Sequence, residues 1–343
     1  MSGGTTVVLG WDALDWTLLE EFDLREAFGE HATRIETFDN PVLGKPHTYE
    51  VWPSIVTGVR PERHGVYAAT EDASLNWEDG RIDALSTLAA GVVPQSIRTE
   101  IGRRLRNRGA RREFRSLDYY REAGVSTVFD DRRALPVAVP NCRTESDDSL
   151  GVVFDRGAQL GEFTYIERGD AGGTRHVPRV PLSRLEQRLE GECVKKLGVV
   201  RAAVQRSYDL VFVWLGFLDS VGHLSPLVEE PGFQHRHYRE AARLTRGVAD
   251  LLRPDDTLVC VSDHGLRGGD HTHDAVLAAS NPGVEAVESV LDVRRYLDSV
   301  TPRRDDPADP SEPPVREAYV GRPTDDHQDA AEVRSRLEGL GYL

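Results

Sequence analysis

Four separated segments of the 343-residue chain carry aspartate and histidine side chains that could bind a metal ion. Carboxylates and imidazoles in this mixture match Zn2+, and they also admit Mn2+ or Mg2+ if further oxygen ligands join them. A single aspartate after a strand is more often a helix cap, so only the combination indicates a metal site. The candidate ligands are Asp12, Asp219, His223, Asp263, His264 and His271.

The segment from Pro46 to Gly58 contains a candidate nucleophile, Thr48, at the expected start of a short helix. Unpaired amides and the helix dipole at such a position favour a negative oxygen or a phosphate. A free threonine hydroxyl is a poor nucleophile at neutral pH, but binding to a divalent cation lowers its proton affinity. The alternative is that Thr48 is only a helix N-cap, and this segment alone does not separate the two interpretations.

The spacing within two of the segments favours a shared site. Asp219 and His223 follow an apolar run, so both side chains can turn into a site just beyond a strand. Asp263 and His264 follow another apolar run in the same manner, and the glycine after them lets the backbone bend around an ion. With Thr48 there are seven candidate ligands, more than one tetrahedral ion can use, so we expect two divalent cations.

The elements that must position these residues are visible as apolar patterns. Continuous apolar runs predict buried strands at residues 5–10, 210–215, 257–261 and 275–279. Long amphipathic stretches at residues 182–205 and 234–252 predict helices before the second and third of these strands. This alternation predicts an α/β fold, with a mostly parallel central sheet flanked by helices on both faces. Ligands of such sheets bind at the carboxyl ends of the strands, where the polar segments lie.

One principal domain, residues 1–300, is expected to hold the whole site. Within it, residues of about 70–140 have less strand character and predict a small cap or insertion. Its arginine-rich segment, 103–115, is interpreted as a solvated helix face, with a substrate clamp as the alternative. Residues 301–343 predict an acidic, proline-rich linker and a short C-terminal helix near 331–339.

The composition argues against several classes of protein. A net charge of −15 argues against general nucleic-acid binding, because phosphate backbones repel such a chain. The apolar runs are too short to cross a bilayer, and the N-terminus lacks a secretory signal, so we expect a cytoplasmic protein without membrane contact. Lysine occurs only at Lys45, Lys195 and Lys196, and an acidic, lysine-poor composition is typical of proteins from salt-loving microbes.

The motifs together resemble a known family. The segment around Thr48, which continues through Arg63, His64 and Gly65, resembles the nucleophile helix of the alkaline phosphatase superfamily. Within that superfamily it is closest to the type I phosphodiesterase and nucleotide pyrophosphatase branch. The Asp219 and His223 pair and the run from Ser262 to Gly265 resemble the later metal motifs, in the same order.

The rest of the chain extends this resemblance. Residues 269–272 resemble the final histidine motif of the superfamily, and residues 336–342 resemble the C-terminus of many members. The similarity spans Thr5 to about Leu297 and implies an alkaline phosphatase-like fold.

Carried over residue by residue, the resemblance implies two cation sites. The first would contain Asp12, Thr48, Asp263 and His264, and the second would contain Asp219, His223 and His271. His273 is the rival of His271 because the two lie close together in the chain. His271 is preferred because it fits the metal-ligand motif.

The sequence departs from the family pattern in one place. The phosphodiesterase branch commonly has an asparagine shortly after the His-Gly pair that holds a phosphate oxygen, but residues 66–70 contain none. Phosphate binding would then rely on the cations, the Thr48 amide, and Lys45 or an arginine. The sulfatase branch needs Cys or Ser in place of Thr48, so the sequence argues against sulfatase chemistry.

The resemblance implies a metal-dependent phosphoric ester hydrolase that acts through a phosphothreonine intermediate at Thr48. Its expected substrates are small-molecule phosphodiesters or nucleotide-like pyrophosphates, with phosphomonoesters next. One alternative is a phosphotransferase with an acceptor other than water. Another is a metal-binding relative without activity, which the absent asparagine favours and the intact set of ligands argues against.

Overall fold

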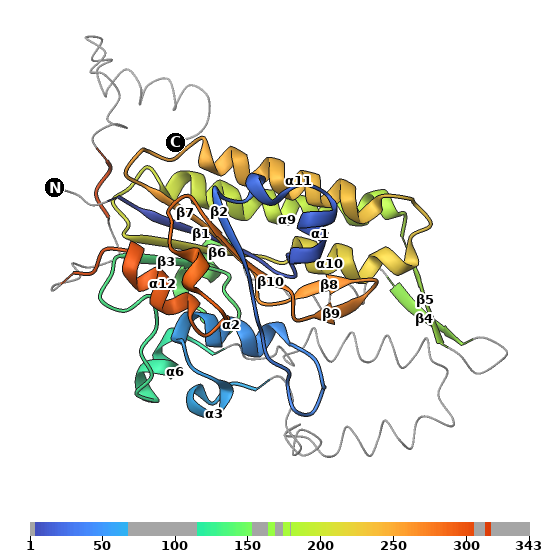
Figure 1. Cartoon of the computed structure of the whole chain (residues 1–343), viewed down its shortest axis with the longest axis horizontal. Helices are drawn as coiled ribbons and strands as arrows, with labels where there is room; N and C mark the ends of the chain where they lie inside the picture. Colours follow the sequence, from blue (N-terminus) through green and yellow to red (C-terminus); the bar gives the residue numbers. More distant parts are fainter. Residues whose placement is uncertain are drawn as a thin grey trace, which may run out of the picture.

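The computed structural model describes residues 4–67, 115–152, 164–168, 174–178, 180–304 and 313–316. A six-stranded sheet with the strand order β2-β10-β7-β1-β6-β3 forms its centre (Figure 1). The strands are β1 (Thr6–Trp11), β2 (His31–Ile35), β3 (Ala134–Val137), β6 (Leu210–Leu215), β7 (Thr257–Val261) and β10 (Ala275–Ala279). All four strands predicted from the apolar runs are present in this sheet.

The pairing of the strands brings three strand ends to one edge of the sheet. β1 pairs in parallel with both β6 and β7, so that Val8 lies opposite Phe212 on one side and Val259 on the other. β3 is also parallel to β6, whereas β10 is antiparallel to β7 and to β2. The prediction of a mostly parallel sheet is therefore confirmed. The carboxyl ends of β1, β6 and β7 lie together at the edge where such folds bind ligands.

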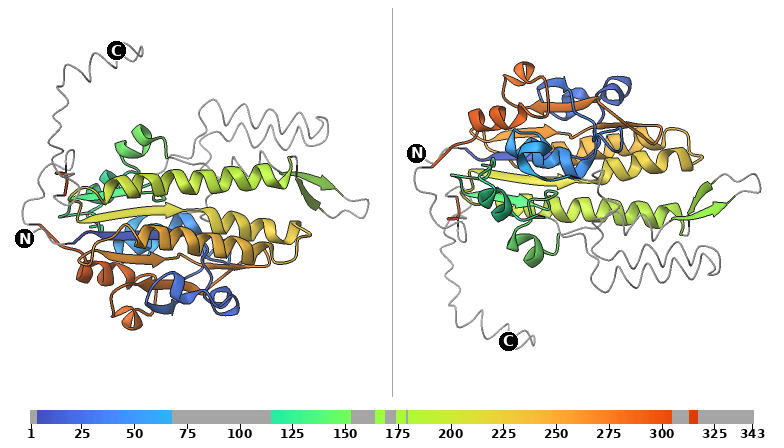
Figure 2. Two further views of the ribbon diagram at one scale, coloured as in Figure 1. Left: turned by 90° about the horizontal axis from the view of Figure 1, so that it is seen from above. Right: turned by 90° about the horizontal axis from the view of Figure 1, so that it is seen from below.

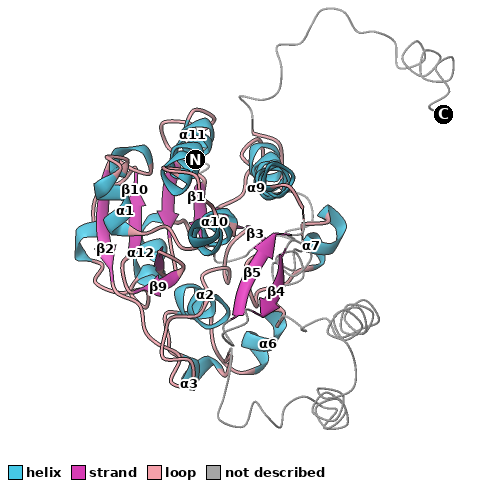
Figure 3. Cartoon of the chain, turned by 90° about the vertical axis from the view of Figure 1, so that its right-hand side faces the viewer, coloured by secondary structure: helices cyan, strands magenta, loops and turns pink. Residues whose placement is uncertain are grey.

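Helices cover both faces of the sheet, as predicted (Figures 1 and 3). The first face packs against α1 (Trp16–Glu21), α9 (Leu182–Ala203), α10 (Phe217–Leu224) and α11 (Phe233–Ala249). The second face packs against α2 (Thr48–Thr57), α6 (Leu117–Glu122) and α12 (Val293–Val300). Alternate residues of β1 point to opposite faces, with Leu9 in the first core and Val8 in the second. Seen from above, the long helices α9 and α11 run side by side (Figure 2).

Shorter elements complete the described fold. They are the helices α3 (Pro61–His64) and α7 (Glu145–Leu150), the paired strands β4 (Thr164–Arg168) and β5 (Thr174–Pro178), and the hairpin strands β8 (Gly265–Arg267) and β9 (Asp270–Thr272). Short 3-10 turns lie at Arg25–Ala27, Ser225–Leu227 and Val284–Ala286. None of the described helices combines the length and the apolar character that crossing a lipid bilayer requires.

Parts of the expected cap and C-terminal segment lie outside the described residues. Residues 70–114, which include nearly all of the arginine-rich segment, belong to this group, as does the short helix expected near 331–339. The described end of the expected cap contributes β3, which joins the edge of the central sheet.

Candidate metal centre

The first cluster of candidate ligands forms where two neighbouring parallel strands end. Asp12 follows β1, and Asp263 and His264 follow β7. All three side chains are fully buried, and each offers a ligand atom within 4.8 Å of the others. The Nε2 atom of His264 lies 3.5 Å from Asp12 Oδ1 and 3.3 Å from Asp263 Oδ2. The pairing of β1 with β7 thus brings together residues that are about 250 positions apart in the sequence.

The second cluster joins helix α10 to strand β9. Asp219 and His223 lie four residues apart on α10, which places them on the same face of the helix. His223 Nε2 is 3.5 Å from Asp219 Oδ1 and 3.1 Å from His271 Nε2. Asp219 is buried, whereas 31% of the His223 side chain is exposed to solvent. The second cluster therefore faces solvent through His223.

Two of the histidines are oriented by backbone carbonyl groups. His271 Nδ1 lies 2.7 Å from the Pro46 carbonyl oxygen, and His264 Nδ1 lies 3.1 Å from that of Gly265. A carbonyl oxygen only accepts hydrogen bonds, so each Nδ1 carries the hydrogen and each Nε2 keeps a lone pair directed into its cluster. Burial and the nearby His264 lower the pKa of His271 to about 3. His271 is therefore neutral at physiological pH, as a metal ligand must be.

The ionised carboxylates of the two clusters repel each other. Burial, together with the charge of Asp219, raises the pKa of Asp263 from 3.8 to about 7. Ionised carboxylates packed this closely in a water-poor site repel each other, and a bound divalent cation would remove that cost. The donor types, the histidine orientations and the electrostatics thus fit one divalent cation at each cluster.

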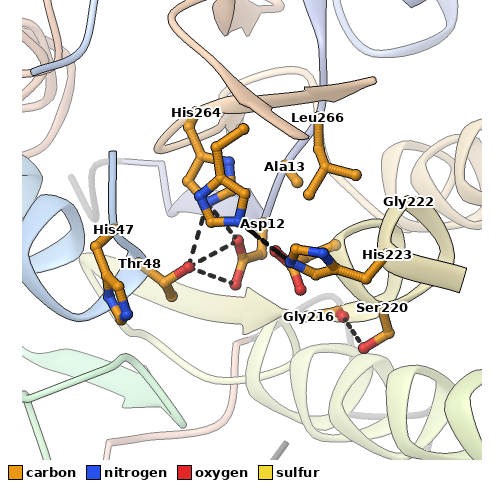
Figure 4. Close-up of polar contacts among 12 residues, drawn as sticks. Asp12, Ala13, His47, Thr48, Gly216, Ser220, Gly222, His223, His264 and Leu266 are labelled. Carbon is orange, nitrogen blue, oxygen red and sulfur yellow. Dashed lines mark hydrogen bonds and ion pairs between the residues drawn. The ribbon is translucent and has the colours of Figure 1, made fainter. Parts of the chain in front are cut away.

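Thr48 directs its hydroxyl group into the first cluster (Figure 4). Its Oγ1 atom lies 3.3 Å from Asp12 Oδ1 and 3.3 Å from His264 Nε2. Thr48 is the first residue of α2, and the N-cap is His47, whose Nδ1 atom accepts a hydrogen bond of 3.2 Å from the Tyr49 amide. The interpretation of Thr48 as the helix N-cap is therefore wrong, and its hydroxyl group is directed towards the ligands instead.

Close packing fixes helix α2 against the strand that carries Asp12. A Cβ atom added to Gly10 would lie 2.7 Å from the ring of Trp52, so only glycine allows this approach of α2 to β1. At the far side, the buried His64 lies 2.9 Å from Ser54 Oγ and joins α3 to α2. His64 Nδ1 accepts a hydrogen bond from the Val66 amide, and burial lowers its pKa to about 4. His64 is therefore a structural residue of the motif around Thr48.

The hairpin of β8 and β9, which carries His271, is anchored on both sides. Thr272 Oγ1 donates a 2.8 Å hydrogen bond to Asp15, which also caps α1 by accepting from the Leu18 amide. Burial raises the pKa of Asp15. On the other side, Leu266 packs against α10 at Gly222. These contacts set the position of His271 relative to the ligands on α10.

Other residues singled out in the sequence lie elsewhere. His273 is exposed just after β9, and its Nε2 atom is 2.7 Å from Asp39 Oδ1, so it belongs to neither cluster. Lys45 is exposed in the loop before α2. The described end of the arginine-rich segment, Arg115, stacks over the ring of Tyr119.

Sequence reasoning missed two groups that hold the aspartates of the first cluster. The Trp214 indole donates a 3.2 Å hydrogen bond to Asp12 Oδ2, and the Ala13 amide donates one of 3.3 Å to Asp263 Oδ1. In the register of β1 and β6, Trp214 lies opposite Gly10, and Gly10 comes two positions before Asp12 in the sequence. A tryptophan near the end of an apolar run is the signal that could have pointed to this contact.

The chain matches the family model described as type I phosphodiesterase/nucleotide pyrophosphatase over residues 6–340. No curated protein matches it. Among solved structures, the PH0037 protein from Pyrococcus horikoshii is similar at 12% identity and a TM-score of 0.44, over 88% of this chain and 98% of that one.

Two further structures resemble the chain at a similar level. Alkaline phosphatase from the Antarctic bacterium TAB5 has 11% identity and a TM-score of 0.41, over 88% of this chain and 98% of that one. Murine ectonucleotide pyrophosphatase/phosphodiesterase 5 has 14% identity and a TM-score of 0.39, over 76% of this chain and 57% of the murine chain.

Proposed function

The chain belongs to the type I phosphodiesterase/nucleotide pyrophosphatase family, and we propose that it is a metal-dependent phosphodiesterase with Thr48 as its nucleophile. The observation that carries this proposal is the position of the Thr48 hydroxyl group. It lies at the start of α2, within 3.3 Å of both Asp12 and His264, beside a second cluster of candidate ligands. Membership of the family supports phosphoric ester hydrolysis, and the geometry of Thr48 supports a covalent route.

The two clusters are the proposed sites of two divalent cations. Asp12, Asp263 and His264 would hold one together with the Thr48 oxygen, and Asp219, His223 and His271 would hold the other. The mixture of carboxylate and imidazole donors favours Zn2+, with Mn2+ or Mg2+ as alternatives. Bound cations would lower the proton affinity of the Thr48 hydroxyl group and offset negative charge on the phosphate oxygens.

In this proposal Thr48 and Asp12 would carry out the bond-forming and proton-transfer steps. The Thr48 hydroxyl donates towards Asp12, which gives the proton of the nucleophile a nearby acceptor. Thr48 Oγ1 would form the new bond to phosphorus while the bond to the leaving oxygen breaks, and the released alcohol takes up a proton. Water would then attack phosphorus from the opposite side and give up a proton as the bond to Thr48 breaks, so that Thr48 Oγ1 regains a proton and the phosphate product is released.

The Thr48 amide, at the start of α2, is proposed to hold a phosphate oxygen, because the amides after it already donate to His47. The amides at the start of a helix have no partner within the helix, and the helix dipole favours negative charge there. Thr48 occupies the first position of α2, so its own amide lies beside its nucleophilic oxygen. This contact would partly replace the asparagine that residues 66–70 lack.

The experiment that tests this proposal compares two threonines of the same helix. Thr48→Ala is expected to abolish hydrolysis of a model phosphodiester in the presence of Zn2+ or Mn2+, and Thr48→Ser is expected to keep some activity. The control is Thr57→Ala, because buried Thr57 donates a 2.6 Å hydrogen bond to the Pro53 carbonyl within α2. This control should lose about 1 kcal/mol of stability but retain turnover.

A second measurement tests the covalent route. An acid quench during turnover should trap a phosphorylated peptide that spans residues 45–60. Normal turnover in Thr48→Ala would overturn the proposal. A wild-type protein that binds both cations but hydrolyses neither phosphodiesters nor phosphomonoesters would support the inactive relative, and transfer to an added alcohol in place of water would indicate a phosphotransferase.

A further inference from the structure

Two consecutive residues of β6 hold the ligand candidate Asp12. The Asp12 amide donates a 3.1 Å hydrogen bond to the Leu215 carbonyl, and the Trp214 indole donates one of 3.2 Å to Asp12 Oδ2. The other carboxylate oxygen, Oδ1, lies 3.5 Å from His264 Nε2. The indole bond therefore fixes the rotation of the carboxylate and directs Oδ1 towards the other candidate ligands of the first cluster.

The Trp214 ring is itself fixed by a buried lysine. Lys196 extends from α9, and its Nζ atom donates a 3.1 Å hydrogen bond to the Trp214 carbonyl. The same ammonium group lies 4.3 Å from the centre of the Trp214 ring, where a cation is attracted to the face of an indole. At the edge of the ring, a Cβ atom added to Gly216 would lie only 2.7 Å from the Trp214 Cη2 atom, so glycine is required at position 216. The indole is thus confined between Lys196 and Gly216.

A buried ammonium group costs free energy, because it gives up its hydration. Only 2% of Lys196 is exposed, and burial lowers its pKa to about 8, so the group remains mostly charged at pH 7. Its neighbour Lys195 is exposed and donates to the Gly151 carbonyl at the surface. Of these two adjacent lysines on α9, Lys195 therefore keeps its hydration and Lys196 loses it.

We propose that Lys196 and Trp214 form a positioning pair that holds the Asp12 carboxylate in the orientation required for cation binding at the first cluster. The Lys196 ammonium group over the ring fixes the indole and polarises its N–H group, and this N–H group orients Asp12. Groups that orient a metal ligand in this way typically contribute 10-fold to 100-fold to metal affinity. This inference rests on the proposed function, because it assumes that the two clusters bind cations.

The test is a calorimetric titration of the metal-stripped full-length protein with Zn2+. The wild-type protein is expected to bind two Zn2+ ions. Trp214→Phe keeps an aromatic ring but removes the N–H group, and it should weaken one of the two binding events by about 10-fold to 100-fold while the other stays unchanged. Lys196→Met should weaken the same event, and it should add little in a protein that already carries Trp214→Phe.

Two matched variants control for general effects on packing. Lys195→Met removes the exposed neighbouring lysine, and Trp16→Phe alters a tryptophan that stacks with Arg25 outside both clusters. Both should keep the two wild-type affinities. If Lys196→Met does not fold, Lys196→Gln takes its place, because it keeps a polar hydrogen-bond donor in the side chain but carries no charge.

The possible outcomes separate this inference from the proposed function. A wild-type protein that binds fewer than two Zn2+ ions would contradict the two-cation proposal itself. If the wild-type protein binds two ions and Trp214→Phe binds both unchanged, the positioning pair is wrong. Equal weakening of both events by Lys196→Met, or additive losses in the double variant, would likewise overturn it, because they indicate a general loss of packing.

Discussion

The ring of His264 stacks on the ring of His271, with centroids 4.1 Å apart and planes inclined by 13°. The two histidines belong to different clusters and reach this contact from opposite ends of a short segment that includes β8 and β9. Their stacking joins the clusters into one unit, and protonation of either ring would place a positive charge against the other. At most one of the two rings can therefore be charged without repulsion between them.

This contact leads to a prediction about His271 and its neighbour His273. We expect His271→Ala to lose the second cation and at least 100-fold in phosphodiester turnover, because it removes a ligand candidate and the ring that covers His264. His273→Ala should retain both cations and most of the activity, because His273 pairs with Asp39 at the surface. Metal content by elemental analysis and steady-state kinetics would check this. The reverse pattern would make His273 the ligand.

A second prediction concerns the stability of the metal-free protein. The pKa of Asp263 is raised from 3.8 to about 7, so the folded metal-free protein binds a proton at Asp263 more tightly than the unfolded chain does. The resulting contribution to stability is fully present below pH 3.8 and is lost as the pH rises through about 7. The melting temperature of chelated protein should therefore fall between about pH 4 and pH 7 relative to Asp263→Asn. In the wild-type protein saturating Zn2+ should remove this fall, because a bound cation offsets the charge of the ionised carboxylate. If chelated wild-type protein and the variant follow the same pH profile, the crowded carboxylates do not control stability.

The third prediction uses the buried His64. Its folded pKa of about 4 lies below the ordinary value of 6.5, so its contribution to stability is present above pH 6.5 and is lost as the pH falls towards 4. His64→Gln should be about 1–3 kcal/mol less stable at pH 7 but should lose less stability on acidification. Urea unfolding at pH 7 and pH 5 measures both effects. His235→Gln, which alters a partly exposed ring stacked on Phe22, should change the stability at pH 7 less than His64→Gln does.

A fourth prediction tests the contact between α10 and the β8 to β9 hairpin. A Cβ atom at Gly222 would lie 2.0 Å from Leu266 Cδ2 and 3.1 Å from its Cγ, so Gly222→Ala must displace the buried Leu266. We expect a loss of about 1–3 kcal/mol and weaker cation binding at the second cluster, since His223 and His271 move apart. Gly191→Ala on α9 has free space around the added methyl group and should be neutral or slightly stabilising. Equal effects of the two substitutions on cation binding would contradict this account.

Much of the fold could be predicted because its central strands are unmixed apolar runs. The runs that became β1, β6, β7 and β10 are buried along their whole length, and the two long helices begin and end within three residues of the predicted positions. The strands β2 and β3 could not be found in this way. β2 lies at an edge and carries polar residues, and β3 has four residues that include Pro136.

The site was predictable to the extent that its residues follow strands. Asp12 and Asp263 could be placed at one edge because parallel neighbours end together. Contacts between distant segments carried no such signal. The bond from His271 to the Pro46 carbonyl and the bond from Trp214 to Asp12 depend on the packed tertiary structure, which no local pattern encodes. The assignment of the ligands to bound cations stays a prediction.

The central position of β1 has a consequence for how the protein is made. Thr6 pairs with Leu210 on one side and with Thr257 on the other, so β1 leaves the ribosome long before either of its partner strands is made. During synthesis it remains an unpaired apolar strand, a state that is prone to aggregation and that long-range pairing resolves slowly. A chain that terminates before β7 would lack one side of its central strand and would have no folded state of this topology. Premature termination should therefore yield aggregated or degraded protein in the cell, even when the truncated chain already contains several of the candidate ligand residues.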